Sequence, residues 1–106
     1  MSIRDLSPVE AKNKLDREGG VKLLDVRTPE EKSRADIGGD IIPVQELEER
    51  LQELNASDKY IIYCHHGGRS AEASRILQNA GFNSVWNLAG GIDRWSLEVD
   101  STVARY

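Results

Sequence analysis

The sequence predicts a small open α/β sheet of parallel strands with helices on both faces. Short apolar runs alternate with segments of helical periodicity along the 106 residues, which is the pattern of parallel βαβ units. The run at 59–63 is β-branched and aromatic without alternation, as in a central strand covered on both faces. No internal repeat, low-complexity tract or linker divides the chain, so we expect a single domain over residues 1–106.

The first predicted helix begins at Pro8. Ser7 is a suitable N-cap, proline suits the first helical position, and Glu10 completes a capping box. We expect this helix to end at the glycine pair 19–20.

A strand is predicted next, at residues 21–26, because this run is mostly apolar. Pro29 then permits only a fresh helical turn. Asp25 and Arg27 are therefore expected at the carboxyl end of a strand.

The middle of the chain predicts elements that cover the sheet, and it carries no catalytic motif. Residues 36–43 indicate a turn and a very short strand, which ends at Pro43 because proline cannot donate to a ladder. Residues 44–54 predict a helix with a charged outer face. Its apolar residues fall on one side: Leu47, Leu51 and Leu54.

Cys64, the only cysteine of the chain, follows the strand at 59–63 directly. The loop CHHGGRS at 64–70 comes next and leads into a predicted amphipathic helix at 70–80. Gly81 supplies a left-handed stop for this helix.

The end of the chain predicts a last strand at 84–88 and a short helix at 92–97 that buries Trp95. The glycine pair 90–91 between them either forms a plain turn or approaches the active-site edge. Residues 99–106 have no periodicity and are expected to form an irregular C-terminal tail.

Composition argues against nucleic acid or membrane as a partner. The 18 acidic and 14 basic residues give a net charge of −4 without a block of like charge. A lone cysteine makes no internal disulfide, and the amino terminus lacks the apolar run of a signal peptide. We therefore expect a soluble protein of the reducing cytoplasm, since no window reaches membrane-spanning length.

The Cys64 loop carries the chemistry that the sequence predicts. Ligands of open α/β sheets bind beyond the carboxyl ends of the strands, where Asp25, Arg27 and this loop meet. Backbone N–H groups at a helix N-terminus stabilise an anion there, either the thiolate or a substrate oxyanion. Arg69 either binds an oxyanion with its planar fork or ties the loop to a carboxylate.

Four landmarks follow one another in an order and spacing that resembles the rhodanese-like domain family over nearly the whole chain. They are Leu24-Asp25-Val26-Arg27, Ile42-Pro43, Cys64 with Arg69 and Ser70, and Gly90-Gly91-Ile92 with Trp95. The resemblance implies a five-stranded parallel sheet and a sulfurtransferase of the thiosulfate:cyanide type that needs no cofactor. Cysteine would take the sulfane sulfur of thiosulfate or a persulfide donor and pass it to cyanide, a thiol or a protein.

Carried over to this chain, the resemblance makes Cys64 the nucleophile and the loop after it the substrate cradle. The expected substrate-binding residues are His65, His66, Gly67, Gly68, Arg69 and Ser70. Lys32 and Asp36 depart from the common family pattern, which often has an aromatic residue and a histidine at these places.

Cysteine-dependent phosphatases and arsenate reductases are the enzymatic rivals. Such phosphatases place five residues between cysteine and arginine, whereas four separate Cys64 from Arg69. The shorter loop favours a pocket for sulfur over one for a tetrahedral oxyanion. A non-turnover persulfide carrier or regulatory protein-binding module is the alternative from another functional class.

Several roles stay open at this point. His65 and His66 either line the pocket or direct their side chains to solvent, and with no other histidine a metal ligand set is hard to assemble. Asp25 and Arg27 are candidates for a supporting role. A structural ion pair, for instance of Arg27 with Glu30 or Glu31, is favoured over contact with substrate.

Overall fold

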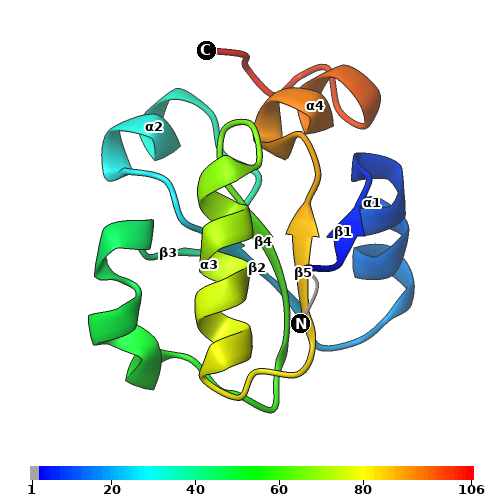
Figure 1. Cartoon of the computed structure of the whole chain (residues 1–106). Helices are drawn as coiled ribbons and strands as arrows, with labels where there is room; N and C mark the ends of the chain where they lie inside the picture. The colour runs from blue at the N-terminus through cyan, green and yellow to red at the C-terminus, as the bar shows by residue number, and fades with distance from the viewer. Residues whose placement is uncertain (1–2) are drawn as a thin grey trace.

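The computed structural model describes residues 3–106, and they form a five-stranded parallel sheet with the strand order β1-β5-β4-β2-β3 (Figure 1). The strands are β1 (Asp5–Leu6), β2 (Val21–Asp25), β3 (Asp40–Ile41), β4 (Lys59–Tyr63) and β5 (Val85–Leu88). The α-helices are α1 (Pro8–Arg17), α2 (Pro29–Arg34), α3 (Gly68–Asn79) and α4 (Gly91–Glu98). Two 3-10 helices complete the set, η1 (Val44–Glu46) and η2 (Glu48–Glu53). The predicted fold class is confirmed.

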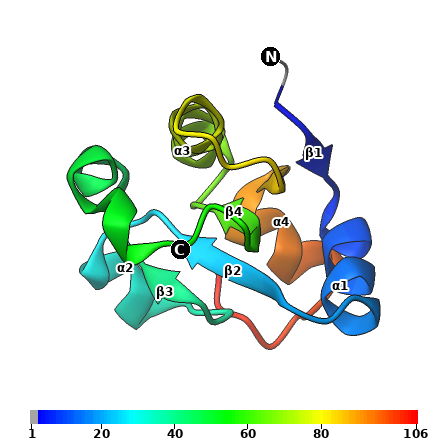
Figure 2. The ribbon, with the colours of Figure 1, turned by 90° about the horizontal axis from the view of Figure 1, so that it is seen from below.

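Helices cover both faces of the sheet, and β4 shows why. Tyr60 and Ile62 belong to the core cluster under α3 and the 3-10 helices, whereas Ile61 and Tyr63 belong to the cluster under α1 and α4. Alternate side chains of a strand point to opposite faces, so an uninterrupted apolar strand needs helices packed on both faces of the sheet. Figure 2 shows α3 on one side of the sheet and α1 with α4 on the other.

Helices α1 and α2 both begin with a capping box. Ser7 caps α1 and forms a capping box with Glu10, as predicted, and Thr28 caps α2 with Glu31 in the same way. Each box satisfies two backbone N–H groups that a helix start leaves unpaired. The box at α2 fixes the Glu31 side chain at the carboxyl edge of the sheet.

The helix predicted for residues 44–54 is the clearest correction to the expected fold. This segment forms η1 and η2 instead, with a break at Arg50 (φ −116°, ψ 16°). Val44 with Leu47, and Leu51 with Leu54, are each spaced by three residues, which suits 3-10 turns of three residues as well as it suits an α-helix. The inward face was predicted correctly, because Leu47 is buried and Leu51 and Leu54 pack against the same cluster.

Other boundaries differ by one or two residues. Helix α3 begins at Gly68 and ends at Asn79, where residues 70–80 were expected. The very short strand is present as β3, but it ends at Ile41 rather than at Pro43, and hydrogen bonds continue on both sides of the proline: Ile42 N–H donates to Asp25 O and Val44 N–H donates to Val26 O. The two residues that depart from the family pattern pair with each other, Lys32 Nζ lying 3.0 Å from Asp36 Oδ2.

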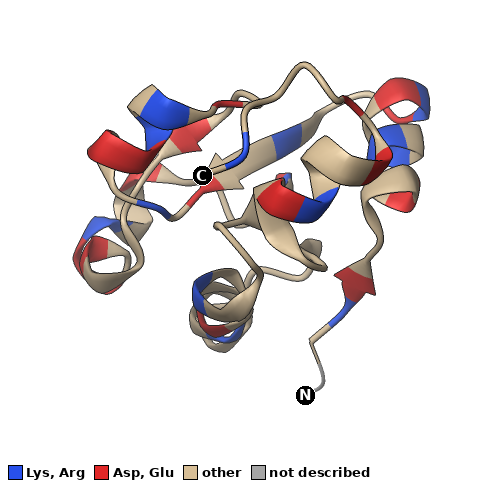
Figure 3. Ribbon diagram, turned by 90° about the horizontal axis from the view of Figure 1, so that it is seen from above, with Lys and Arg blue, Asp and Glu red and all other residues tan. Residues whose placement is uncertain are grey.

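The surface matches the mixed composition. Figure 3 shows basic and acidic positions interspersed over the helices and loops, without a block of one sign. Within residues 3–106, every helix is too short or too polar to cross a lipid bilayer.

Candidate functional site

Cys64 lies at the carboxyl end of β4 and is only 1% exposed. Two backbone N–H groups point at its sulfur: Gly67 N at 3.1 Å and Ser70 N at 3.4 Å from Sγ. Ser70 Oγ is also 3.4 Å from Sγ. Gly67 is the N-cap of α3 with φ +110°, a left-handed conformation that favours glycine. The sulfur therefore sits at a helix N-terminus that stabilises negative charge.

Helix α4 contacts the backbone of the Cys64 loop. Ile92 N–H donates to Cys64 O at 2.9 Å, and Asp93 N–H donates to His65 O at 3.2 Å. Gly91 has φ +64°, and a Cβ placed there would lie 2.6 Å from Cys64 O. Of the two interpretations left open for the glycine pair, the structure therefore shows the close approach to the active-site edge.

Arg69 makes an ion pair with Glu31, with Nη1–Oε1 2.6 Å and Nη2–Oε2 2.8 Å. Tyr106 Oη also donates to Glu31 Oε2 at 2.8 Å. The Arg69 hydrogen bonds, with help from Tyr106 and the Thr28 cap, hold the pKa of Glu31 well below its usual range, against the effect of burial. Arg69 thus ties the loop to a carboxylate, one of its two expected roles.

Asp25 and Arg27 form a fully buried ion pair beside the loop strand. Arg27 Nη2 lies 2.7 Å from Asp25 Oδ2, and Arg27 Nε lies 2.9 Å from Asp25 Oδ1. The expected partner was therefore wrong: the carboxylate is that of Asp25, not of Glu30 or Glu31, since Arg27 reaches only the backbone oxygen of Glu31. Asp25 Oδ1 also accepts from Arg27 N, so a local turn brings the two side chains together.

The two histidines lie in one stack of rings. His65 stacks on Tyr106 with a centroid distance of 3.9 Å and an interplanar angle of 9°, and His66 stacks on the other face at 3.9 Å. Burial, and then the neighbouring His66, lower the pKa of His65. The His66 side chain is 68% exposed. His65 thus lines the site, and His66 faces solvent.

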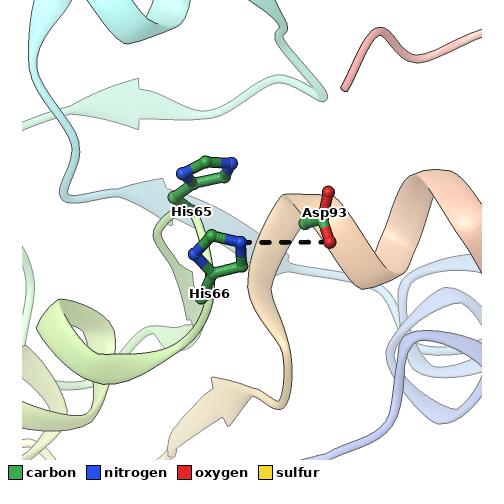
Figure 4. Close-up of side chains that lie close together, drawn as sticks. All are labelled: His65, His66 and Asp93. Atoms are coloured by element: carbon green, nitrogen blue, oxygen red, sulfur yellow. Dashed lines mark ion pairs between the residues drawn. The ribbon is translucent and has the colours of Figure 1, made fainter. Parts of the chain in front are cut away.

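A third group, Asp93, completes a cluster with ligand atoms within 4.8 Å of one another (Figure 4). Counting histidine and cysteine alone in the sequence misses this carboxylate. Stacked imidazoles, however, cannot aim their in-plane lone pairs at one ion without rotating, and Asp93 already pairs with Arg105 at 2.9 Å. The cluster is therefore not arranged as a preformed metal site.

Sequence reasoning missed two residues at this site. Glu31 has a recognisable signal, the T-x-x-E capping pattern, which fixes where its carboxylate stands. Tyr106 has no local signal, because its hydrogen bonds reach Arg27 and Glu31, 79 and 75 residues away.

Comparisons with known proteins agree on one family. The model of the rhodanese-like domain matches residues 7–98. The Bacillus subtilis protein named "Putative sulfur carrier protein YrkF" is 40% identical over 96 residues, which are 90% of this chain and 52% of that protein, so the chain spans about half of it. "Thiosulfate sulfurtransferase 16, chloroplastic" of Arabidopsis thaliana is 36% identical over 90 residues, covering 73% of this chain and 75% of that one. A Staphylococcus aureus rhodanese-like domain protein superposes with a TM-score of 0.82 at 28% identity, covering 98% of this chain and 99% of the other.

Proposed function

The chain belongs to the rhodanese-like domain family, and from this membership we infer that it transfers sulfane sulfur through a persulfide on Cys64. The observation that carries the assignment to Cys64 is the pair of backbone N–H groups, from Gly67 and Ser70, that face its sulfur at the N-terminus of α3. Such donors stabilise negative charge on sulfur before and after the transfer.

The proposed reaction is a double displacement. The Cys64 thiolate attacks the outer sulfur of thiosulfate, the sulfur–sulfur bond of thiosulfate breaks, and sulfite leaves with the electron pair. Cys64 now carries one additional sulfur as a persulfide. A nucleophilic acceptor such as cyanide or a thiol then attacks the terminal sulfur, and the thiolate is regenerated.

The loop residues take distinct parts in this proposal. The backbone around Gly67 and Gly68 forms the cradle, and Ser70 adds its N–H and hydroxyl groups beside the sulfur. Arg69 fixes the loop through Glu31. Because Asp25 and Arg27 are buried against each other, their supporting role is to rigidify the end of β2 rather than to contact substrate.

A second candidate is a persulfide carrier with little turnover on small donors. One observation favours it: a relative is named as a sulfur carrier. The donor and acceptor would then be proteins. In either case the thiol must stay reduced, so a cytoplasmic location belongs to the proposal.

Intact-mass measurement after incubation with thiosulfate tests the shared step. We expect one added sulfur atom on the wild type and none on Cys64→Ser, since the chain has one cysteine. No added sulfur on the wild type, or equal addition on Cys64→Ser, would refute the proposal. Saturable conversion of cyanide to thiocyanate supports the enzyme, whereas persulfide formation without turnover supports the carrier.

A further inference from the structure

The segment 99–106 has no helix or strand, but it is tied to the carboxyl edge of the sheet. Three of its side chains pack against the core cluster under α1 and α4: Val99, Val103 and Tyr106. Ser96 Oγ donates to Val103 O at 2.6 Å, and Arg105 pairs with Asp93 at 2.9 Å. Figure 2 shows this segment, in red, running back from the side of α1 toward α2. Its last residue, Tyr106, therefore reaches the candidate site.

The Tyr106 hydroxyl joins two ion pairs. It accepts a hydrogen bond from Arg27 Nη1 at 3.0 Å and donates one to Glu31 Oε2 at 2.8 Å. Arg27 can only donate and an ionised carboxylate can only accept, so a hydroxyl, which does both, suits this position. Through Glu31 the hydroxyl also supports Arg69, the last residue before Ser70 in the loop.

The Tyr106 ring acts on the other end of the loop. It lies parallel to the His65 imidazole at a centroid distance of 3.9 Å, and His66 covers the opposite face of His65. His65 directly follows Cys64 in the chain. Its ring is therefore held between two others, and its orientation depends on both of them.

We propose that Tyr106 is a positioning residue of the sulfur-transfer site, holding the Cys64 loop at both ends, through His65 and through Glu31 with Arg69. Of the donors that face the sulfur, Gly67 N lies between these two ends and Ser70 N directly follows Arg69. Hydrogen bonds weaken steeply when their angles change, so a small shift of either end weakens the stabilisation of negative sulfur. The inference rests on the proposed function for the role of Cys64.

Three variants of the full chain separate the contribution of the Tyr106 hydroxyl from that of its ring. Tyr106→Phe removes only the hydroxyl, and Tyr106→Leu removes the hydroxyl and the stacked ring. Tyr60→Phe is the matched control, because its hydroxyl accepts from Asn55 N at 3.1 Å and does not contact the loop. The readouts are the pH profile of Cys64 alkylation by iodoacetamide, kcat and KM for thiosulfate, and NMR titration of the imidazoles, of which the chain has two.

We expect Tyr106→Phe to slow the alkylation of Cys64 along the pH profile, because weaker N–H donation to the sulfur stabilises its negative charge less. Its kcat should fall roughly tenfold with little change in KM, less than the ~10²-fold loss for a misplacement of about 1 Å. Tyr106→Leu should show larger effects. It should also raise the pKa of His65, since it removes the aromatic ring that helps to bury His65, and burial lowers this pKa. Tyr60→Phe should match the wild type in all three readouts.

An alkylation profile of Tyr106→Phe that coincides with the wild type would overturn the role of the hydroxyl. An unchanged His65 titration in Tyr106→Leu would overturn the role of the ring. If Tyr106→Leu fails to fold, Tyr106→Phe still decides whether Tyr106 positions the loop. Alkylation and NMR need no sulfur transfer, so a wild type that accepts no sulfur refutes the proposed function without deciding the role of Tyr106.

Discussion

Glu31 and Arg69 face each other across the candidate site and share two hydrogen bonds, of 2.6 and 2.8 Å. Glu31 belongs to the first turn of α2 and Arg69 to the first turn of α3, so the pair joins two helix starts at the carboxyl edge of the sheet. A two-point contact between a guanidinium and a carboxylate fixes direction as well as distance. Arg69 thereby anchors the loop that bends around Cys64.

The Glu31→Gln variant should lose about 1–2 kcal/mol of unfolding free energy at neutral pH. A hydrogen bond to a charged group contributes about 1.5–3 kcal/mol, and solvent screening reduces this value because Arg69 is 36% exposed. Glutamine still suits a capping box, so the change removes mainly the charge. Because folding lowers the pKa of Glu31, its contribution is complete above the ordinary value of 4.5 and is lost as the pH falls below it.

Urea unfolding of both proteins between pH 3 and pH 7 measures this difference. The gap between wild type and Glu31→Gln should be constant near neutrality and should narrow below pH 4.5. Glu49→Gln on the exposed side of η2 is the matched control and should unfold like the wild type at each pH. A gap that stays the same down to pH 3 would show that the ion pair with Arg69 does not stabilise the fold.

The Asp25→Asn variant should be strongly destabilised, by about 3–5 kcal/mol, because it leaves Arg27 buried without a counter-charge. Both side chains of this pair are 0% exposed. Asp16→Asn breaks the solvent-exposed pair with Lys12 and should cost less than about 1 kcal/mol. Guanidinium unfolding of both variants tests the contrast, and similar losses would contradict it.

The Ser70→Ala variant should lower the rate of persulfide formation roughly tenfold, less than the 10²–10³ typical for a well-placed oxyanion donor. Ser70 Oγ is 3.4 Å from the sulfur and also donates to Gly67 O at 3.2 Å. Its single proton must turn toward the sulfur to stabilise a thiolate, and alanine cannot supply it. The rate is followed by intact mass after mixing with thiosulfate.

Ser74→Ala is the control for this experiment. Ser74 is a second buried serine of α3, and its hydroxyl donates to Ser70 O at 2.8 Å rather than to the sulfur. It should form persulfide at nearly the wild-type rate. Equal rates in Ser70→Ala and Ser74→Ala would show that the Ser70 hydroxyl does not act on Cys64.

Most of the fold was predictable because its signals are local. The capping box at Ser7 and the apolar run of β4 each act within a few residues, and the structure bears out both. The sequence also indicated correctly that Cys64 follows a strand and precedes a helix. These signals were enough to predict that the carboxyl ends of β2 and β4 lie at the same edge of the sheet.

The rest depends on contacts between segments distant in sequence or on the choice between similar local geometries. Apolar spacing of three and four residues does not separate an α-helix from the 3-10 turns of η1 and η2. Glutamates at positions 30 and 31 looked equally suited to Arg27, but its neighbour Asp25 lies closer in space. Tyr106 enters the site only because the tail folds back over the sheet edge.

The Gly91→Ala variant should disturb both the stability and the sulfur chemistry. Its φ of +64° disfavours alanine, and the added Cβ would lie 2.6 Å from Cys64 O. Backbone on both sides leaves little room to move, so we expect a cost of about 1–3 kcal/mol for overpacking, added to about 1–2 kcal/mol for the left-handed conformation. The Cys64–His65 peptide should shift, and persulfide formation should slow.

Gly20→Ala supplies the matched control for this prediction, because Gly20 has a φ of +78° and a Cβ placed there would have no neighbouring atom within 4 Å. It should therefore show only the conformational cost of about 1–2 kcal/mol, with a normal rate of persulfide formation. The difference in unfolding free energy between the two variants isolates the contact of a Cβ at position 91 with the carbonyl groups of Cys64 and His65. Equal destabilisation with equal activity would mean that the loop yields freely and that α4 does not fix the position of Cys64.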